Sequence, residues 1–175
     1  PGGVVPGTGT ICLQSGARMN HCLKWIVAIG VLLLPLRAHA LLATCTVAVS
    51  GGGIAFGTYA SPGTAHSDGS STVTVTCSGL GVLVSYTIAM GPGNGNYANR
   101  KLMSGANFLN YNMYTNIART VVWGDGSAGT QTVSHSYLIG LGNVTHNYNV
   151  FGRIPGNQNQ PAGTYTDSVT VTVTY

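Results

Sequence analysis

The stretch Asp167-Ser168-Val169-Thr170-Val171-Thr172-Val173-Thr174-Tyr175 at the end of the sequence decides the fold class. Apolar and hydroxyl-bearing side chains alternate along it, which predicts an extended strand with one apolar face. That face consists of Val169, Val171, Val173 and Tyr175. β-Branched residues suit a half-buried pleated surface, so the pattern favours a strand strongly. A long strand without charge in its alternating part needs a partner that covers its edge and its apolar face.

Similar alternation occurs in several segments upstream. Residues 71–79 (STVTVTCSG) place Val73, Val75 and Cys77 on one face, and residues 82–90 (VLVSYTIAM) alternate in the same way. Residues 44–50 and 54–59 predict a first strand in two pieces, joined by a kink at Gly51–Gly53. Further strand-like segments are 108–115 (FLNYNMYT), 120–123 (TVVW), 130–140 (TQTVSHSYLIG) and 146–154 (HNYNVFGRI). About seven short strands without any amphipathic helical period predict an antiparallel β-sandwich.

The formal net charge of +4 comes largely from the first forty residues. From Leu41 onward, three acidic residues nearly balance the basic ones, which are Arg100, Lys101, Arg119 and Arg153. A nucleic-acid-binding surface needs clustered Lys and Arg, so no nucleic-acid partner is expected.

Residues 19–40 (MNHCLKWIVAIGVLLLPLRAHA) have the pattern of a secretory signal peptide. Lys24 supplies the basic region, Trp25–Leu34 the apolar region, and Ala38 and Ala40 the small residues of the cleavage site. The apolar run of about ten residues is shorter than the ~20 needed for a membrane-spanning helix. We interpret residues 1–18 as a spurious upstream extension. Residues 41–175 are then the exported domain, and no transmembrane segment is expected in it.

Export changes the interpretation of the cysteines. Cys12 and Cys22 lie in the segment expected to be removed, which leaves Cys45 and Cys77 in the exported domain. In an oxidising compartment these two are expected to pair, although two buried free thiols remain the alternative. Because both cysteines share the parity of the apolar residues in their strands, a disulfide that faces the core is favoured over a surface staple. Neither cysteine has His or a second Cys at the spacing of a zinc site.

The exported domain offers little for catalysis. Gly126-Ser127-Ala128-Gly129 follows Asp125, where a nucleophile elbow requires Gly, and no glycine-rich phosphate-binding motif is present. A lone Asp125 fits an Asp-Gly turn better than a calcium site. His135 lies between Ser134 and Ser136, which predicts an exposed histidine on a polar strand face. We therefore expect no enzyme, no cofactor and no metal.

Several strings occur together: CTVAVSGGGIAFGTY, YTIAMGPGNGNYANRKLMSG, LNYNMYTNIARTVVWGDGSAGT and VFGRIPGNQNQPAGTYTDSVTVTVTY. Together they resemble the spore coat protein U domain family, which includes subunits of archaic chaperone–usher pili, over Cys45–Tyr175. The resemblance implies an incomplete immunoglobulin-like antiparallel β-sandwich of Greek-key topology that lacks one strand. It also implies partners: a periplasmic assembly chaperone that fills the gap first, an outer-membrane usher, and a neighbouring pilus subunit whose N-terminal strand replaces the chaperone. Such an addition of a strand is β-augmentation.

The resemblance also implies roles for individual residues. Cys45 and Cys77 match the family disulfide, and Val169, Val171, Val173 and Tyr175 match the strand beside the acceptor groove where the chaperone docks. Arg119, Trp123, Asp125 and Arg153 match recurrent family positions, to which we assign structural roles only. We expect that Arg119 and Asp125 can pair across a hairpin, an exposed contact worth only ~0–1 kcal/mol.

The segment ahead of Cys45 departs from the pattern of polymerising subunits. If cleavage follows Ala40, only Leu41–Thr44 precede Cys45, and they span roughly 13 Å at ~3.3 Å per residue. A subunit of this kind accepts a strand but hardly donates one, which favours a tip or terminal subunit at the cell surface. Earlier cleavage would leave part of Val31–Leu34 as a donor, but Pro35 and Arg37 suit a strand poorly. The alternative hypothesis is a self-contained secreted coat or matrix protein, or an adhesive module that binds through loops such as Gly91–Tyr97.

Overall fold

The structure is a computed structural model that describes residues 43–175, with side chains described throughout that range except at 80–82 and 139–141. The predicted signal peptide and upstream extension lie outside the described residues. The described chain forms six β-strands and one short 3₁₀ turn. Their bounds are β1 Thr44–Val49, η1 Ser50–Gly52, β2 Ser67–Met90, β3 Arg100–Ser104, β4 Asn107–Tyr114, β5 Val133–Ile154 and β6 Val171–Thr174.

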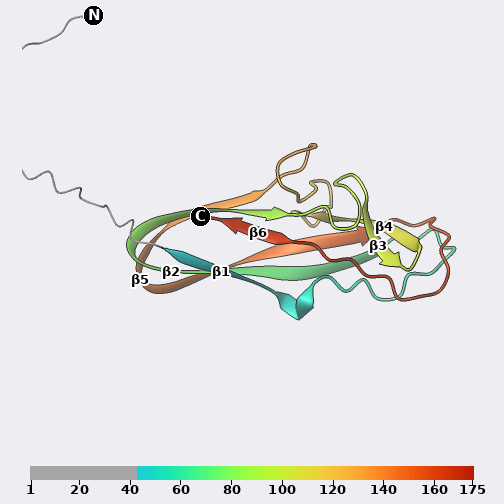
Figure 1. Ribbon diagram of the computed structural model, residues 1–175, viewed down its shortest axis with the longest axis horizontal. Helices are drawn as coiled ribbons and strands as arrows, with labels where there is room; N and C mark the ends of the chain where they lie inside the picture. The colour runs from blue at the N-terminus through green and yellow to red at the C-terminus, as the bar shows by residue number, and fades with distance from the viewer. Residues whose placement is uncertain (1–42) are drawn as a thin grey trace, which may run out of the picture. The chain divides into compact units, whose positions relative to one another are not determined.

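Two long antiparallel strands, β2 and β5, organise the fold (Figure 1). Their ladder runs from Ser67↔Ile154 to Ile88↔Val133 and includes the facing glycines Gly79↔Gly142. The prediction of separate short strands at 71–79 and 82–90, and again at 130–140 and 146–154, was therefore wrong. The two facing glycines carry no Cβ, so no side chain crowds the inside of a bend at this point. The strand pair can therefore bend here and keep its hydrogen bonds.

The bend turns the β2–β5 pair back on itself, so that the two halves face each other as two layers. In the register of the ladder, Tyr86 pairs with His135 and Tyr148 pairs with Val73. Nevertheless, the hydroxyl groups of Tyr86 and Tyr148 lie 2.6 Å apart, which places them on opposite sides of the same interior. The inward-facing parity changes at the bend, because odd-numbered residues up to Cys77 and even-numbered residues from Val84 are buried. This change of parity is why the sequence pattern looked like two strands.

The remaining strands extend these two layers. The strand order is β1-β2-β5-β4-β3, with β6 paired to the end of β2. The arrangement confirms the predicted all-β, immunoglobulin-like antiparallel sandwich. Residues 54–59, expected as the second piece of the first strand, form no strand, and residues 120–123 contribute only isolated bridges. Within residues 43–175, no helix has the length and apolar character needed to cross a membrane.

The core lies between the layers, and its buried polar residues Arg100, Asn112 and Thr130 are hydrogen-bonded. It contains, among others, Val73, Val75, Cys77, Val84, Tyr86, Ile88, Leu109, Tyr111, Trp123 and Val150. Trp123 is fully buried, and its indole N–H donates to the carbonyl of Ile88 at 3.1 Å, so this large side chain leaves no polar atom unpaired.

The prediction for His135 was wrong. Ser134 and Ser136 are exposed, but His135 is only partly exposed, and its ring lies 4.2 Å from the ring of His146. The alternation of a strand explains this result, because His135 shares its parity with Val133 and Tyr137, which pack against the core.

Candidate functional site

Strands β1 and β6 leave one side of the sandwich open. β1 pairs with β2 at Val73–Ser78, and β6 pairs with β2 at Thr87–Met90. Since β5 occupies the other edge of β2 up to Ile88, both short strands use the same edge of β2, one on each side of the bend. Among the described residues, neither β1 nor β6 pairs with any further strand, so each presents an open edge to the other.

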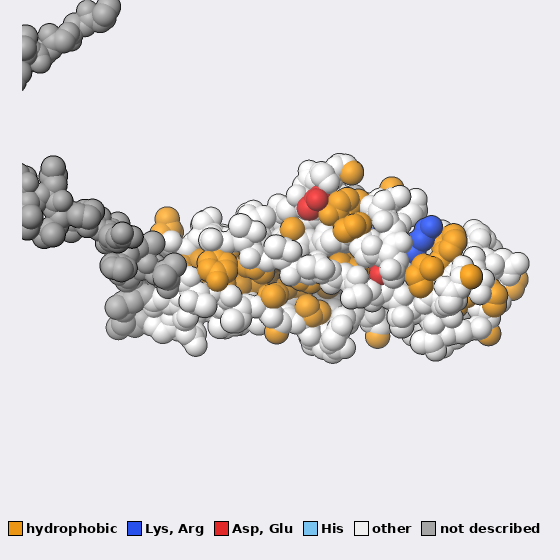
Figure 2. All heavy atoms as spheres, viewed as in Figure 1, with side chains coloured by type: hydrophobic (Ala, Val, Ile, Leu, Met, Phe, Trp, Pro, Cys, Tyr) orange, Lys and Arg blue, Asp and Glu red, His pale blue; other side chains and the backbone are white. Residues whose placement is uncertain are grey.

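An apolar cavity of about 140 Å³ lies between these open edges. One wall comes from the end of β1 and the turn after it, and the other from the segment that leads into β6. The lining residues include Val49, Ile54 and Phe56 on the first side, Val169 and Val171 on the second, and Val73, Leu102, Tyr111 and Met113 at the base. Figure 2 shows hydrophobic side chains gathered in a band on the face between β6 and β1.

A wider hollow of about 640 Å³ continues this cavity past the end of β1. Its walls are residues 52–61 and 160–167, and it shares Ile54, Phe56, Leu102 and Asp167 with the first cavity. The two hollows therefore form one groove, which we call the β1–β6 groove: residues 49–61 on one side and 160–171 on the other.

Of the residues predicted to border an acceptor groove, Val169 and Val171 line the β1–β6 groove, whereas Val173 and Tyr175 line neither hollow. Val169, Val171 and Val173 are half-buried and pack against the core, and the hydroxyl side chains between them are exposed. Tyr175, predicted on the same face, is 57% exposed. Val47 of β1 shares the parity of Val49, which lines the groove, and is 39% exposed. Apolar surface is therefore left uncovered on both sides.

Asp167 fixes the β6 side of the groove. Its carboxylate accepts hydrogen bonds from the backbone N–H and the side-chain amide of Asn94 and from the Tyr111 hydroxyl. The same carboxylate packs against Gly93, whose φ of +61° and lack of Cβ allow the contact. Burial and the neighbouring Asp167 carboxylate raise the pKa of the Tyr111 hydroxyl, which therefore stays a donor. Loop 91–97 is thus tied to the strand that borders the groove.

The buried Arg100 anchors the first residue of loop 91–97, Gly91. Its side chain is fully buried, and it donates to the carbonyl of Gly91 at 2.9 and 2.8 Å and to the carbonyl of Trp123 at 2.7 Å. It also donates to Asn112 Oδ1 at 2.5 Å and lies over the Tyr97 ring. A buried guanidinium is tolerated here because acceptors surround it.

The expected pairing of Arg119 with Asp125 was wrong. Arg119 lies 3.2 Å from Asp68, and its Nε donates to the carbonyl of Gly152. Asp125 instead accepts hydrogen bonds from the backbone and hydroxyl of Ser127, as an Asp-Gly turn does. Arg153 completes the Asp68 cluster with hydrogen bonds of 2.7 and 2.8 Å to the carboxylate. Both arginines therefore bind Asp68, near the start of β2. Asp125, which is closer to Arg119 in the sequence, bonds within its own turn.

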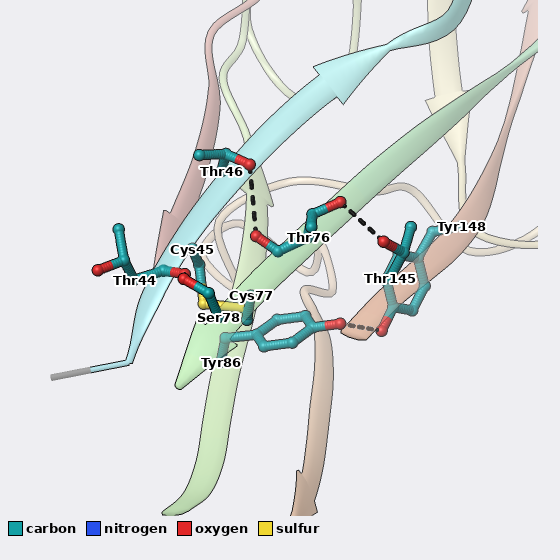
Figure 3. Close-up of a disulfide and its surroundings, with 9 residues drawn as sticks. All are labelled: Thr44, Cys45, Thr46, Thr76, Cys77, Ser78, Tyr86, Thr145 and Tyr148. Atoms are coloured by element: carbon teal, nitrogen blue, oxygen red, sulfur yellow. Dashed lines mark hydrogen bonds between the residues drawn. A yellow bond between two sulfur atoms is a disulfide. The ribbon is translucent and has the colours of Figure 1, made fainter. Parts of the chain in front are cut away.

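Cys45 and Cys77 form a disulfide that joins β1 to β2 (Figure 3). Cys77 is fully buried, and Tyr86 lies beside the bond, with its hydroxyl directed away from the sulfur atoms toward Tyr148. The described residues contain no group of three or more His, Cys, Asp or Glu side chains arranged to hold a metal ion.

The sequence offered no sign of the roles of Arg100 and Asp167. Arg100 follows a polar loop and precedes a lysine, a context typical of solvent-exposed residues. Asp167 stands first in the terminal alternating stretch, which predicts a strand and no particular role for its carboxylate. Both roles depend on contacts between segments distant in the sequence, which periodicity does not encode.

Comparisons with known proteins agree with this geometry. Protein U of Myxococcus xanthus is 37% identical over 68 residues, which cover 39% of this chain and 35% of Protein U. A similar solved structure is the CsuC–CsuE chaperone–tip adhesion subunit pre-assembly complex from archaic chaperone–usher Csu pili of Acinetobacter baumannii. The similarity has a TM-score of 0.51 at 27% identity and covers 77% of this chain and 40% of that chain. The chain thus spans less than half the length of either relative. The family model of the Spore Coat Protein U domain matches residues 33–172, so the chain belongs to the Spore Coat Protein U domain family.

Proposed function

We propose that this chain is an exported structural subunit of a surface fibre of the archaic chaperone–usher pilus type, and that the β1–β6 groove receives a strand from another chain. The observation that carries the proposal is the pair of open strand edges on either side of an apolar groove. The proposal assigns no catalytic role, and it places the mature protein at the cell surface after passage through the periplasm.

The groove has the two features that β-augmentation needs. The open edges of β1 and β6 offer unpaired backbone groups for main-chain hydrogen bonds, and the apolar base offers sites for alternate side chains of the incoming strand. Half-exposed Val47 and half-buried Val169 and Val171 would be covered by such a strand. Burial of apolar surface at about 25 cal/mol per Å² would stabilise the completed sandwich.

We propose a periplasmic assembly chaperone as the first occupant, followed at an outer-membrane usher by a strand of a neighbouring subunit. The similar solved structure supports this order, since it is a pre-assembly complex of a chaperone with a tip adhesion subunit. Residues Val169, Val171, Val173 and Tyr175 form the docking strand in this proposal.

A tip or terminal position in the fibre fits the segment ahead of the disulfide. If cleavage follows Ala40, Leu41–Thr44 precede Cys45, and Thr44 is already paired with Ser78 within β1. The three residues before Thr44 would extend roughly 10 Å at ~3.3 Å per residue, too short to fill a neighbour's groove. N-terminal sequencing of the exported protein tests this part: a start at Leu41 supports it, and a start that leaves about a dozen residues before Cys45 contradicts it.

A self-contained coat or adhesive protein is the second candidate, favoured by the match to the Spore Coat Protein U domain. The exposed residues of loop 91–97 would then be the contact surface. Because Asn94 and Gly91 are tied to Asp167 and Arg100, truncation of the loop would damage the fold. Lysine at the exposed Pro92 and Ala98 is the sharper test. If this variant attaches to surfaces as well as the wild type does, loop 91–97 is not the contact surface.

Co-expression with a cognate periplasmic chaperone tests the main proposal. We expect a soluble one-to-one complex, and we expect Val169→Asp to abolish it because a carboxylate would enter the apolar groove. Thr170→Asp is the matched control, since its side chain is exposed on the opposite face. Protection of the open β1 and β6 edges from hydrogen exchange in the mature chain alone, without any partner, would contradict the proposal.

A further inference from the structure

Two histidines face each other between the layers of the sandwich, away from the β1–β6 groove. His135 lies in the half of β5 before the bend, and His146 lies in the half after it. Their ring centroids are 4.2 Å apart, and the planes are tilted by 45°. Neither residue lines either hollow of the groove. The pair is therefore a contact between the layers that the proposed function does not use.

Aromatic rings enclose this pair. Tyr137 lies 4.6 Å from His146, and Tyr86 and Tyr148 lie 6.0 and 6.2 Å from His135 between ring centroids. The Tyr86 and Tyr148 hydroxyls bond to each other at 2.6 Å, so they are already engaged. By contrast, His146 Nε2 and the Tyr137 hydroxyl are buried without a hydrogen-bond partner. The surroundings suit a neutral imidazole and offer little to an imidazolium.

No carboxylate among the described residues compensates a charge at this place. The ionisable groups that face the pair are Tyr86 from β2 and Tyr137 and Tyr148 from β5. β1 contributes only the disulfide-bonded Cys45, and β6 contains no ionisable residue. Asp68 and Arg153, the charged residues of β2 and β5, pair with each other at the far end of the ladder. Tyrosine rings attract a cation weakly, but an unpaired buried charge costs more than such contacts return.

We propose that His135 and His146 form an acid-sensitive latch, in which the neutral rings pack the two layers together and protonation drives the layers apart near the disulfide. Burial and the nearby His135 lower the pKa of His146, in agreement with this geometry. An unfolded histidine titrates near about 6.5. The latch therefore makes its full contribution to the free energy of unfolding above that pH. This contribution is lost as the pH falls from about 6.5 toward the lower pKa of His146 in the folded state.

Unfolding of the oxidised full chain in urea, followed by Trp123 fluorescence, tests the latch at neutral and mildly acidic pH. When the unfolded state binds one more proton than the folded state, the unfolding equilibrium constant rises by up to about tenfold for each unit by which the pH falls in this interval. We expect such a rise in the wild type, a much smaller rise in H146Q, a lesser reduction of the rise in H135Q, and an unchanged rise in H66Q. His66 is the matched control because it is exposed and lies beside Asp68. A wild-type stability that does not fall between about pH 7 and pH 5, or a full rise in both latch variants, overturns the proposal.

An NMR titration of the wild type tests the latch even if the histidine variants fail to fold. In the wild type, the NMR signals of the His146 ring should titrate below about 6.5, the value for a free histidine. Titration at or above that value overturns the proposal. The experiment uses a single chain without a partner strand, so the latch can fail while the proposed function stands, and the reverse also holds.

Discussion

The carboxylate of Asp167 accepts hydrogen bonds of 3.0 and 2.8 Å from the backbone and side-chain amides of Asn94, 73 residues earlier in the chain. Tyr111 donates a third bond to the same carboxylate from the core, at 2.7 Å. Asp167 also lines both hollows of the β1–β6 groove. One side chain thus connects a surface loop, the core and the strand that borders the groove.

Asp167→Ala should lower the free energy of unfolding by about 2 kcal/mol. The change leaves the part-buried Tyr111 hydroxyl and the Asn94 amides without their acceptor, and hydrogen bonds to a charged group contribute about 1.5–3 kcal/mol. Urea unfolding at neutral pH measures the loss. Asp125→Ala is the matched control, because the Asp125 side chain is exposed and accepts hydrogen bonds from Ser127 in its own turn. Equal losses in the two variants would contradict the role of Asp167.

Much of the fold was predictable because the alternation of apolar residues fixes which side chains are buried. Val73, Val75 and Cys77 face the core as their parity predicts, and so do Val84 and Tyr86. The continuity of β2 was not predictable, because the ladder crosses glycines where the inward parity changes. Such a change normally marks the end of a strand, and only the pairing of Gly79 with Gly142 shows that the hydrogen bonds continue.

Arg100→Met should destabilise the protein by about 3 kcal/mol or more. Methionine fills a similar volume but leaves the carbonyls of Gly91 and Trp123 without their donor, and each buried unpaired group costs about 1–3 kcal/mol. Thermal and urea unfolding report the loss. Lys101→Met should change stability by less than about 1 kcal/mol, because Lys101 makes only a cation–π contact with Phe108. Wild-type stability of the Arg100 variant would contradict the anchoring role.

Asp68 should make stability depend on pH below about 4. Its hydrogen bonds to Arg153, together with the charge of Arg119, hold its pKa below the ordinary value of 3.8. A lowered carboxyl pKa contributes stability that is complete above the unfolded pKa and is lost as the pH falls through the folded one. Asp68→Asn should therefore cost roughly 1 kcal/mol at neutral pH, given the partial exposure of the cluster.

Unfolding of Asp68→Asn and of the wild type across acidic pH checks this prediction. The difference between the two proteins should shrink as the pH falls below about 4, where the wild-type carboxyl becomes protonated. A difference that persists unchanged in strong acid would mean that Asp68 acts through packing rather than through its charge.

The candidate site was predictable on one side only. The alternation of Val169, Val171 and Val173 predicts a strand whose edge and apolar face need a cover, and the family resemblance implies that this strand borders an acceptor groove. The opposite side could not be predicted, because residues 54–59 looked like a strand and instead line the hollow as an irregular segment. Glycines 51–53 all have positive φ, which ends β1 and turns Ile54 and Phe56 toward the groove.

Replacement of Cys45 and Cys77 by serine should lower the free energy of unfolding by about 3 kcal/mol. The disulfide closes a loop with a sequence separation of 32, and the chain-entropy model gives roughly 3.5–4 kcal/mol for a loop of that size before strain. Two serines in place of the cysteines also bring hydroxyl groups to a site where Cys77 is fully buried, which adds to the loss. Urea unfolding of the double variant, compared with wild type under oxidising and reducing conditions, measures the effect. Reduced wild type should approach the stability of the variant. If reduction leaves the wild type unchanged, the disulfide does not hold β1 to β2, and the N-terminal side of the groove depends on the β1–β2 ladder alone.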